Sequence, residues 1–190
     1  GEAMAIGRNY ATALQKALRS LEKRGSSFHW GPEERSVQEL LEIARTPTDG
    51  RIVVLQQALR KGATVEQAFE ATAMDPWFLD QIVLINEVAA FIAAAGELDA
   101  ETLRIAKEHG FSDAQIAELR GITETEARGI RHGLDIRPVY KTVDTCAGEF
   151  PALTPYHYSS YDAETEVTPS ERTKVVIIGS GPNRIGQGVE

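Results

Sequence analysis

Residues 76–95 read PWFLDQIVLINEVAAFIAAA, the longest apolar segment of the chain. Large apolar side chains fall on nearly every face of a helix of this length, so we expect neighbouring helices to enclose it on most sides. Asp75 followed by Pro76 predicts where the helix starts, because aspartate caps free amides and proline needs no partner in the first turn. We expect this helix to be the spine of a bundle, with Trp77 and Phe78 in its core.

Polar residues interrupt the same segment at Asp80, Gln81, Asn86 and Glu87. They argue against a membrane span, which needs about 20 consecutive apolar residues. The net charge of −8 argues against a partner held mainly through phosphates, because nucleic-acid affinity rests on basic side chains that displace counterions. The single cysteine, Cys146, and the lack of a basic and apolar leader fit a reducing compartment. We therefore expect a soluble cytoplasmic protein that binds neither membrane nor nucleic acid.

Regularly spaced start and stop signals predict further helices on both sides of the spine. Capping boxes, in which a hydroxyl and a side chain three residues later satisfy free amides, predict three of them. The pairs are Thr64 with Gln67, Ser112 with Gln115, and Thr123 with Glu126. A further N-cap is expected at Asp99, and left-handed helix ends are expected at Gly96, Gly110 and Gly121. With apolar periodicity near residues 10–21, 32–44 and 49–62, the sequence predicts a mainly α-helical bundle of about eight helices.

The character of the chain changes after Pro138. Residues 139–173 are rich in valine, threonine and tyrosine, which favours extended or strand-like chain, and three prolines prevent a long helix. Residues 174–178, KVVII, predict a short apolar strand that runs into a glycine-rich turn. One strand cannot form a sheet by itself. We therefore expect an extended C-terminal tail with an orphan strand, whose sheet partners lie beyond Glu190 in a longer chain.

The turn that follows this strand is the most informative candidate site. It comprises Gly179, Ser180, Gly181, Pro182, Asn183, Arg184, Ile185, Gly186, Gln187 and Gly188. Glycines after a strand let backbone amides approach a phosphate at a helix N-terminus. However, Arg184 stands where the dinucleotide fingerprint needs glycine, and no Gly-Lys-Ser or Gly-Lys-Thr ends the turn. A close-packed turn that lines a cavity is favoured over direct nucleotide binding, which stays an open alternative.

Residues 111–131 have the proportions of a helix-turn-helix around Gly121, and Ala117 stands where two such helices pack closely. A DNA-reading helix presents its first turn to the bases, but this turn carries Glu124 and Glu126, which phosphates repel. We favour a plain helical hairpin and keep a helix-turn-helix DNA-binding module as the alternative. The four histidines match no metal-site spacing, so no metal ligand is predicted.

Three separated stretches resemble the large subunit of carbamoyl-phosphate synthase. GEAMAIGRNYATALQKALRSLE, residues 1–22, is similar to the segment that closes the first ATP-grasp half. RPVYKTVDTCAGEFPALTPYHYSSYD, residues 137–162, is similar to the chain that leaves the helical domain. KVVIIGSGPNRIGQGVE, residues 174–190, is similar to the first strand and glycine turn of the second half. Small departures from the residues common in the family occur at Ala3, Gly148 and Ser180.

The resemblance implies four parts. Residues 1–22 end the first ATP-grasp half, 23–138 form a helical oligomerisation domain, 139–173 connect it onward, and 174–190 begin the second half. The parent is then a ligase that makes carbamoyl phosphate from bicarbonate, glutamine-derived ammonia and two ATP, for arginine and pyrimidine biosynthesis. It uses ATP with Mg or Mn and pairs with a glutaminase small subunit. This chain is then a non-catalytic connecting domain that forms homo-oligomers, has no cofactor or catalytic residue and is inactive alone.

The resemblance also implies that the glycine turn lies beside the route of the carbamate intermediate between the two halves. The residues concerned are Gly179, Ser180, Gly181, Asn183, Arg184, Gly186, Gln187 and Gly188. A free-standing nucleotide-binding protein is a third possibility, and it is disfavoured because only one strand of the required sheet is present.

Overall fold

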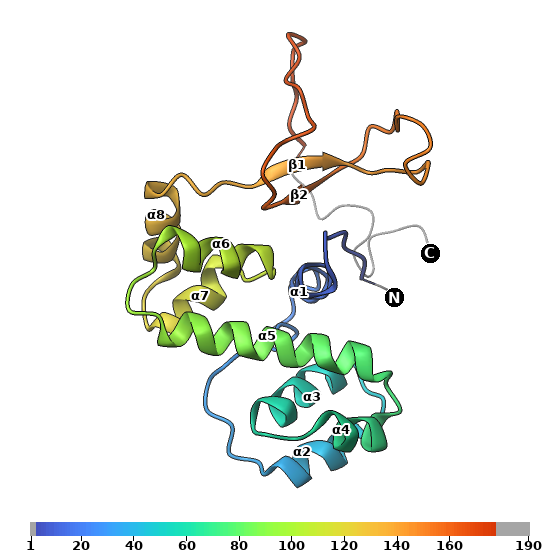
Figure 1. Ribbon diagram of the computed structural model, residues 1–190, viewed down its shortest axis with the longest axis vertical. Coiled ribbons are helices and arrows are strands. Elements are labelled where there is room, and N and C mark those ends of the chain that lie inside the picture. Colours follow the sequence, from blue (N-terminus) through green and yellow to red (C-terminus); the bar gives the residue numbers. More distant parts are fainter. Residues whose placement is uncertain (1–2, 178–190) are drawn as a thin grey trace.

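The structure, a computed structural model, describes residues 3–177. Within that range it has eight helices and one two-stranded sheet (Figure 1). The helices are α1 Tyr10–Ser20, α2 Val37–Ala44, α3 Arg51–Arg60, α4 Val65–Thr72, α5 Pro76–Ala94, α6 Ala100–Glu108, α7 Asp113–Arg120 and α8 Glu124–Gly133, and the strands are β1 Val139–Thr142 and β2 His157–Ser160. The mainly α-helical fold predicted from the sequence is confirmed.

Local capping chemistry starts most of these helices. Side-chain caps begin every described helix except α3, whose N-cap is Gly50. The predicted caps are confirmed at Thr64, Asp75, Asp99, Ser112 and Thr123. Helix α2 begins at Val37 and not near Pro32, because Ser36 and Glu39 form a capping box that the sequence reading overlooked.

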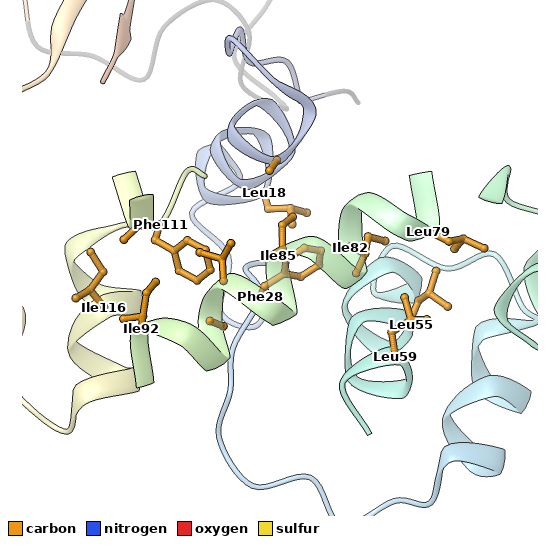
Figure 2. Packing of buried hydrophobic residues seen from close by; sticks show 14 of the residues in the cluster. Leu18, Phe28, Leu55, Leu59, Leu79, Ile82, Ile85, Ile92, Phe111 and Ile116 are labelled. Carbon is orange, nitrogen blue, oxygen red and sulfur yellow. The ribbon is translucent and has the colours of Figure 1, made fainter. Parts of the chain in front are cut away.

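Helix α5 is the central helix, and it packs against α1, α3, α4, α6 and α7. In Figure 1, α2, α3 and α4 lie on one side of it, and α1, α6, α7, α8 and the β-hairpin lie on the other. Its buried stripe consists of Leu79, Ile82, Ile85, Val88, Ala89 and Ile92. Figure 2 shows Leu55 and Leu59 of α3 near one end of this stripe, and Phe111 and Ile116 near the other. One core therefore runs along α5.

The prediction that neighbouring helices enclose α5 on most sides is wrong. Trp77 is 54% exposed, Phe78 43% and Phe91 45%, so the expectation that Trp77 and Phe78 are core residues is also wrong. The neighbouring helices cover one broad face, and the first turn contacts Tyr10 of α1, whose ring centroid lies 5.6 Å from that of Trp77. By length and composition alone α5 would suffice to cross a membrane, but its buried stripe packs on five helices and identifies it as a core helix.

The C-terminus of α5 is capped by Arg120, the last residue of α7. Its guanidinium donates to the carbonyl oxygens of Ile92 and Ala93, both at 3.1 Å, and to that of Ala95. It also donates to the Gly96 carbonyl oxygen at 3.1 Å. The prediction of a left-handed helix end at Gly96 is wrong. Helix α5 ends with Ala95 in a non-helical conformation, and Arg120 satisfies the free carbonyl groups of the last turn.

The chain after α8 forms an antiparallel β-hairpin. Val139 pairs with Ser160, and the loop 143–156 joins the two strands. The strand-like character predicted for this region is confirmed in these two short strands. The strand expected over residues 174–178 is not formed at residues 174–177, where Val175, Val176 and Ile177 are 83%, 83% and 90% exposed. A strand needs a partner for its amides, and the predicted partners lie outside this chain.

Candidate functional site

Helix α1 crosses the C-terminal end of α6 and satisfies its carbonyl groups. Asn9, Thr12 and Gln15 donate side-chain hydrogen bonds to the carbonyl oxygens of Glu108 and His109, at 3.0, 2.8 and 2.8 Å. Arg19 donates in the same way to the Gly110 carbonyl oxygen at 2.6 Å. Three- and four-residue spacing puts these donors on one face of α1, and the last carbonyls of α6 have no partner within their own helix. The two helices are thereby fixed to each other.

Gly110 allows this close crossing. Its φ of +84° is in the left-handed region, and a Cβ added there would lie 2.8 Å from the Cα of Thr12 and 3.1 Å from the carbonyl oxygen of Ala11. Both neighbours are backbone atoms that cannot move aside cheaply. The left-handed helix end predicted at Gly110 is confirmed, and the approach of α1 gives glycine a second reason to be there.

A buried ion cluster lies next to this crossing and is centred on Asp113. Lys107 lies 3.0 Å from the carboxylate, and Arg131 donates to both of its oxygens at 2.9 and 2.8 Å. These three side chains are each 7% exposed. Arg128, which is half exposed, adds a longer contact of 3.3 Å. The cluster joins the end of α6, the start of α7 and the last turn of α8.

Burial and charge set the protonation of this cluster. Burial by itself raises the pKa of Asp113, but the hydrogen bonds from Arg131 and the charge of Lys107 outweigh it and hold the pKa well below its ordinary value. Burial lowers the pKa of Lys107 to about 8, against the attraction of Asp113. A carboxylate shared with Arg131 does not fully offset the desolvation of the ammonium group. Because the pKa of Asp113 lies well below its ordinary value, this carboxylate is ionised at neutral pH.

The end of the β-hairpin is fastened over this cluster. The Tyr161 ring lies 5.1 Å from the Lys107 ammonium and 5.9 Å from the Arg131 guanidinium, within the range of cation–π contacts. Lys16 of α1 donates to the carbonyl oxygens of Ile6 and Ser159. The junction therefore connects three separated parts of the chain: α1, the α6–α8 group and the hairpin.

A cavity of about 460 Å³ lies between these parts and is lined by several basic side chains. Arg8 pairs with Asp162 at 3.3 Å, and Arg19 is bound to Gly110. Lys16 and Lys107 have the partners described above, and Arg128 pairs with Glu124. An anion entering the cavity would have to displace existing hydrogen bonds. The arrangement is suited to holding segments together.

The structure brings none of the glycine-turn residues into this site, because Gly179, Ser180, Gly181, Asn183, Arg184, Gly186, Gln187 and Gly188 all lie outside the described residues. A small apolar thiol is expected to be fully buried, but Cys146 is only half-buried in the loop 143–156. Among residues 3–177, no group of three or more histidine, cysteine, aspartate or glutamate side chains has metal-binding geometry.

The helix-turn-helix candidate forms a plain helical hairpin of α7 and α8. Gly121 is left-handed as predicted, with φ +64°. The first turn of α8 exposes Glu124 and Glu126, and Arg128 and Arg131 are paired with carboxylates. A helix with an acidic first turn and its arginines already paired is poorly suited to phosphates.

Sequence reasoning missed the Asp113 cluster altogether. Lys107 and Asp113 are six residues apart and Arg131 is a further eighteen, so no helical or strand spacing groups them. The one available signal is that Asp113 and Arg131 belong to helices joined by a short turn around Gly121, which brings such helices side by side.

Comparison with known proteins places this geometry in context. The family described as "Carbamoyl-phosphate synthetase large chain, oligomerisation domain" matches residues 2–135. A protein of Clavibacter michiganensis named carbamoyl phosphate synthase large chain is 80% identical over 190 residues. Proteins of the same name from Beutenbergia cavernae and Streptomyces avermitilis are each 63% identical. The match covers all of this chain and 17% of each of these relatives.

Proposed function

Since the chain belongs to the carbamoyl-phosphate synthetase large-chain oligomerisation-domain family, we propose that its helical bundle joins two copies of a longer large chain. The bundle serves as a connecting and self-associating scaffold, and the polar junction holds α1 and the β-hairpin to it. The main support is a face of the bundle that carries exposed apolar side chains and lies away from the connecting segments.

This face is formed by α2 and α4, which pack against each other. Ile43 on α2 is 43% exposed, and Phe69 on α4 is 45% exposed. A groove of about 370 Å³ between the helices has a mixed lining, in which Val37, Leu41 and Ala71 stand among polar and charged side chains, and Ile43 and Phe69 lie outside it. In Figure 1, α1 and the β-hairpin, which adjoin the two ends of the described chain, lie on the other side of α5. A longer chain continuing from there leaves the α2–α4 face free for a second copy.

Substitution of Phe69 tests this proposal. Light scattering over a wide range of concentration should give a dimer for the unmodified chain and a monomer for Phe69→Asp, because a carboxylate cannot be buried unpaired in an apolar contact. Phe91→Asp is the matched control, since Phe91 is equally exposed at 45% but lies on α5. Loss of the dimer in the Phe91 variant, with the Phe69 variant unaffected, would place the contact on another face.

Removal of residues 174–190 tests the competing explanation for a dimer. Val175, Val176 and Ile177 are highly exposed, and such a segment pairs with a copy of itself when its amides have no other partner. We expect the dimer to survive the deletion. A dimer that disappears would show that the segment and not the bundle holds the copies together, and would leave the bundle as a spacer.

The activity of the whole protein is a proposal drawn from the names of its relatives and from the sequence resemblance. The longer chain is proposed to be a cytoplasmic ligase that makes carbamoyl phosphate from bicarbonate, glutamine-derived ammonia and two ATP, with Mg or Mn. A glutaminase small subunit supplies the ammonia, and the product serves arginine and pyrimidine biosynthesis. The 190-residue chain alone is expected to form no ADP with bicarbonate, ammonia and ATP, whereas the full-length chain should.

The glycine turn is proposed to lie beside the route of the carbamate intermediate, on the strength of the sequence resemblance alone. A phenylalanine at Gly188 should then hinder passage. Full-length Gly188→Phe enzyme is expected to consume ATP while making less carbamoyl phosphate per ATP than the unmodified enzyme. Unchanged coupling would remove this role.

A further inference from the structure

The loop 143–156, hereafter the hairpin loop, carries three large apolar side chains that are more exposed than any in the helices of the described chain. Leu153 is 95% exposed, Phe150 69% and Tyr156 67%. Among residues 3–138 the most exposed large hydrophobic side chain is Met4, at 58%. Scattered exposed hydrophobic side chains are ordinary, but three large ones within one short loop mark an interaction surface.

The hairpin loop holds a defined conformation through its own hydrogen bonds. The Asp144 carboxylate accepts from the amides of Cys146 and Gly148 at 2.8 and 2.7 Å. The Val143 amide donates to the Tyr156 carbonyl oxygen at 2.9 Å and closes the loop at its base. A loop that is already ordered loses little conformational entropy when it docks, so its apolar side chains contribute most of their burial to binding.

Strand β2 behind the loop is fastened to the helical body, which fixes the direction in which the loop points. Lys16 of α1 donates to the Ser159 carbonyl oxygen of β2, and Tyr161 after β2 lies over the Asp113 cluster. In Figure 1 the loop extends beyond the ends of β1 and β2 with no helix beside it. The bundle leaves Phe150, Leu153 and Tyr156 exposed.

We propose that the hairpin loop docks onto another part of the same large-chain polypeptide, onto an apolar surface flanked by basic side chains. The family match ends at residue 135, before β1 begins, so the hairpin lies outside the oligomerisation domain proper. The chain spans 17% of its relatives, so most of each relative's length lies outside it and is available as the partner. Val175, Val176 and Ile177 are as exposed as the loop, and they too lie outside the residues that the family model matches.

Charge argues against a second copy as the occupant. The hairpin loop contains Asp144 and Glu149 and neither lysine nor arginine. Glu149 is exposed and directly precedes Phe150. Two copies meeting through this loop would bring their Glu149 carboxylates together, whereas basic groups on a different surface would complement them.

Hydroxyl-radical footprinting of the full-length large chain, read by mass spectrometry, tests the proposal. We expect Phe150 to be labelled as slowly as Phe28 and Phe111, which are each 1% exposed and provide references of the same residue type. The protection should persist at concentrations where light scattering shows a monomer. Labelling of Phe150 at the rate of an unfolded peptide would overturn the proposal, and so would protection that is lost on dilution, because a second copy would then be the cover.

A pair of variants checks that the contact is made by the apolar side chains. Leu153→Asp should raise the labelling of Phe150 and Tyr156 to near the unfolded-peptide rate, while Phe28 stays protected and reports an intact fold. Thr145→Asp adds the same charge at an exposed polar position of the loop and should leave the labelling unchanged. Continued protection of Phe150 in the Leu153 variant would also overturn the proposal. The inference rests on family membership and not on self-association, and the dimer test with Phe69→Asp can fail independently of this one.

Discussion

Gly110 occupies a position where both backbone conformation and space exclude a side chain. Its φ of +84° is unfavourable for any L-residue with a Cβ, and the backbone of α1 at Thr12 lies within 2.8 Å of where that Cβ would be. Gly121 also has a positive φ, of +64°, but nothing lies within 4 Å of its Cβ position. A side chain at Gly121 would meet only an unfavourable backbone conformation, whereas one at Gly110 would also clash with α1.

Gly110→Ala is expected to destabilise the fold by about 2–4 kcal/mol, because conformational strain adds to displacement of α1. Gly121→Ala should cost only about 1 kcal/mol, which is the conformational part alone. Urea denaturation of the two variants measures the difference. Equal losses would mean that α1 does not approach Gly110 closely.

Asp113 pairs with both Lys107 and Arg131. Asp113→Asn leaves two buried cations without a carboxylate and is expected to cost about 3–5 kcal/mol. Lys107→Met removes one cation and keeps the pair of Arg131 with Asp113, so its cost should be smaller. Urea denaturation at pH 7 compares the two variants, and a larger loss for Lys107→Met would contradict the central place of Asp113.

The pH dependence of stability gives a second test of Asp113. Its pKa in the folded chain is below its ordinary value, so the stabilisation is complete above about pH 4 and is lost as the pH falls through the lowered pKa. The free energy of unfolding of the unmodified chain should therefore fall more steeply below pH 4 than that of Asp113→Asn. Parallel curves would show that Asp113 titrates as it does in the unfolded chain.

Helix α5 illustrates how one element can be ended by another. Arg120 of α7 donates to carbonyl groups at the end of α5, so the two helices are fixed at that point. Arg120→Met keeps much of the apolar stem and leaves these carbonyls without their donor, which should cost about 1–2 kcal/mol in thermal or urea denaturation. Arg120→Lys restores the charge without the planar fork and should recover part of the loss. No difference between the unmodified chain and Arg120→Met would mean that water replaces the cap at no cost.

The attachment of the β-hairpin to the bundle is a property of the whole molecule, since it joins α1, α6, α8 and β2. Tyr161 lies over two buried cations, and such contacts are worth about 1 kcal/mol. Tyr161→Leu should speed amide hydrogen exchange in β1 and β2, whereas Tyr161→Phe keeps the ring and should leave it unchanged. Equal exchange in the two variants would show that the hairpin is held by other contacts.

Much of the helical part was predictable because the signals are local. The capping boxes at Thr64, Ser112 and Thr123 involve residues three positions apart, and a chain segment of that length carries the whole interaction. The Ser36 capping box is equally local, and the start of α2 predicted near residue 32 was wrong because this box was overlooked. The strand predicted over residues 174–178 was wrong at residues 174–177, because apolar and β-branched composition favours a strand but only a paired neighbour makes one.

The sequence alone therefore determined the number of helices, most of their starts and the family, because these depend on neighbouring residues and on short stretches that resemble the family. Only the tertiary structure decided which face of α5 is buried, since its composition puts apolar side chains on nearly every face and the packing of α1, α3, α4, α6 and α7 covers one. It also decided that Arg120 ends α5 and that Asp113 gathers Lys107 and Arg131. These contacts join residues far apart in the chain, and their geometry exists only once the helices have packed.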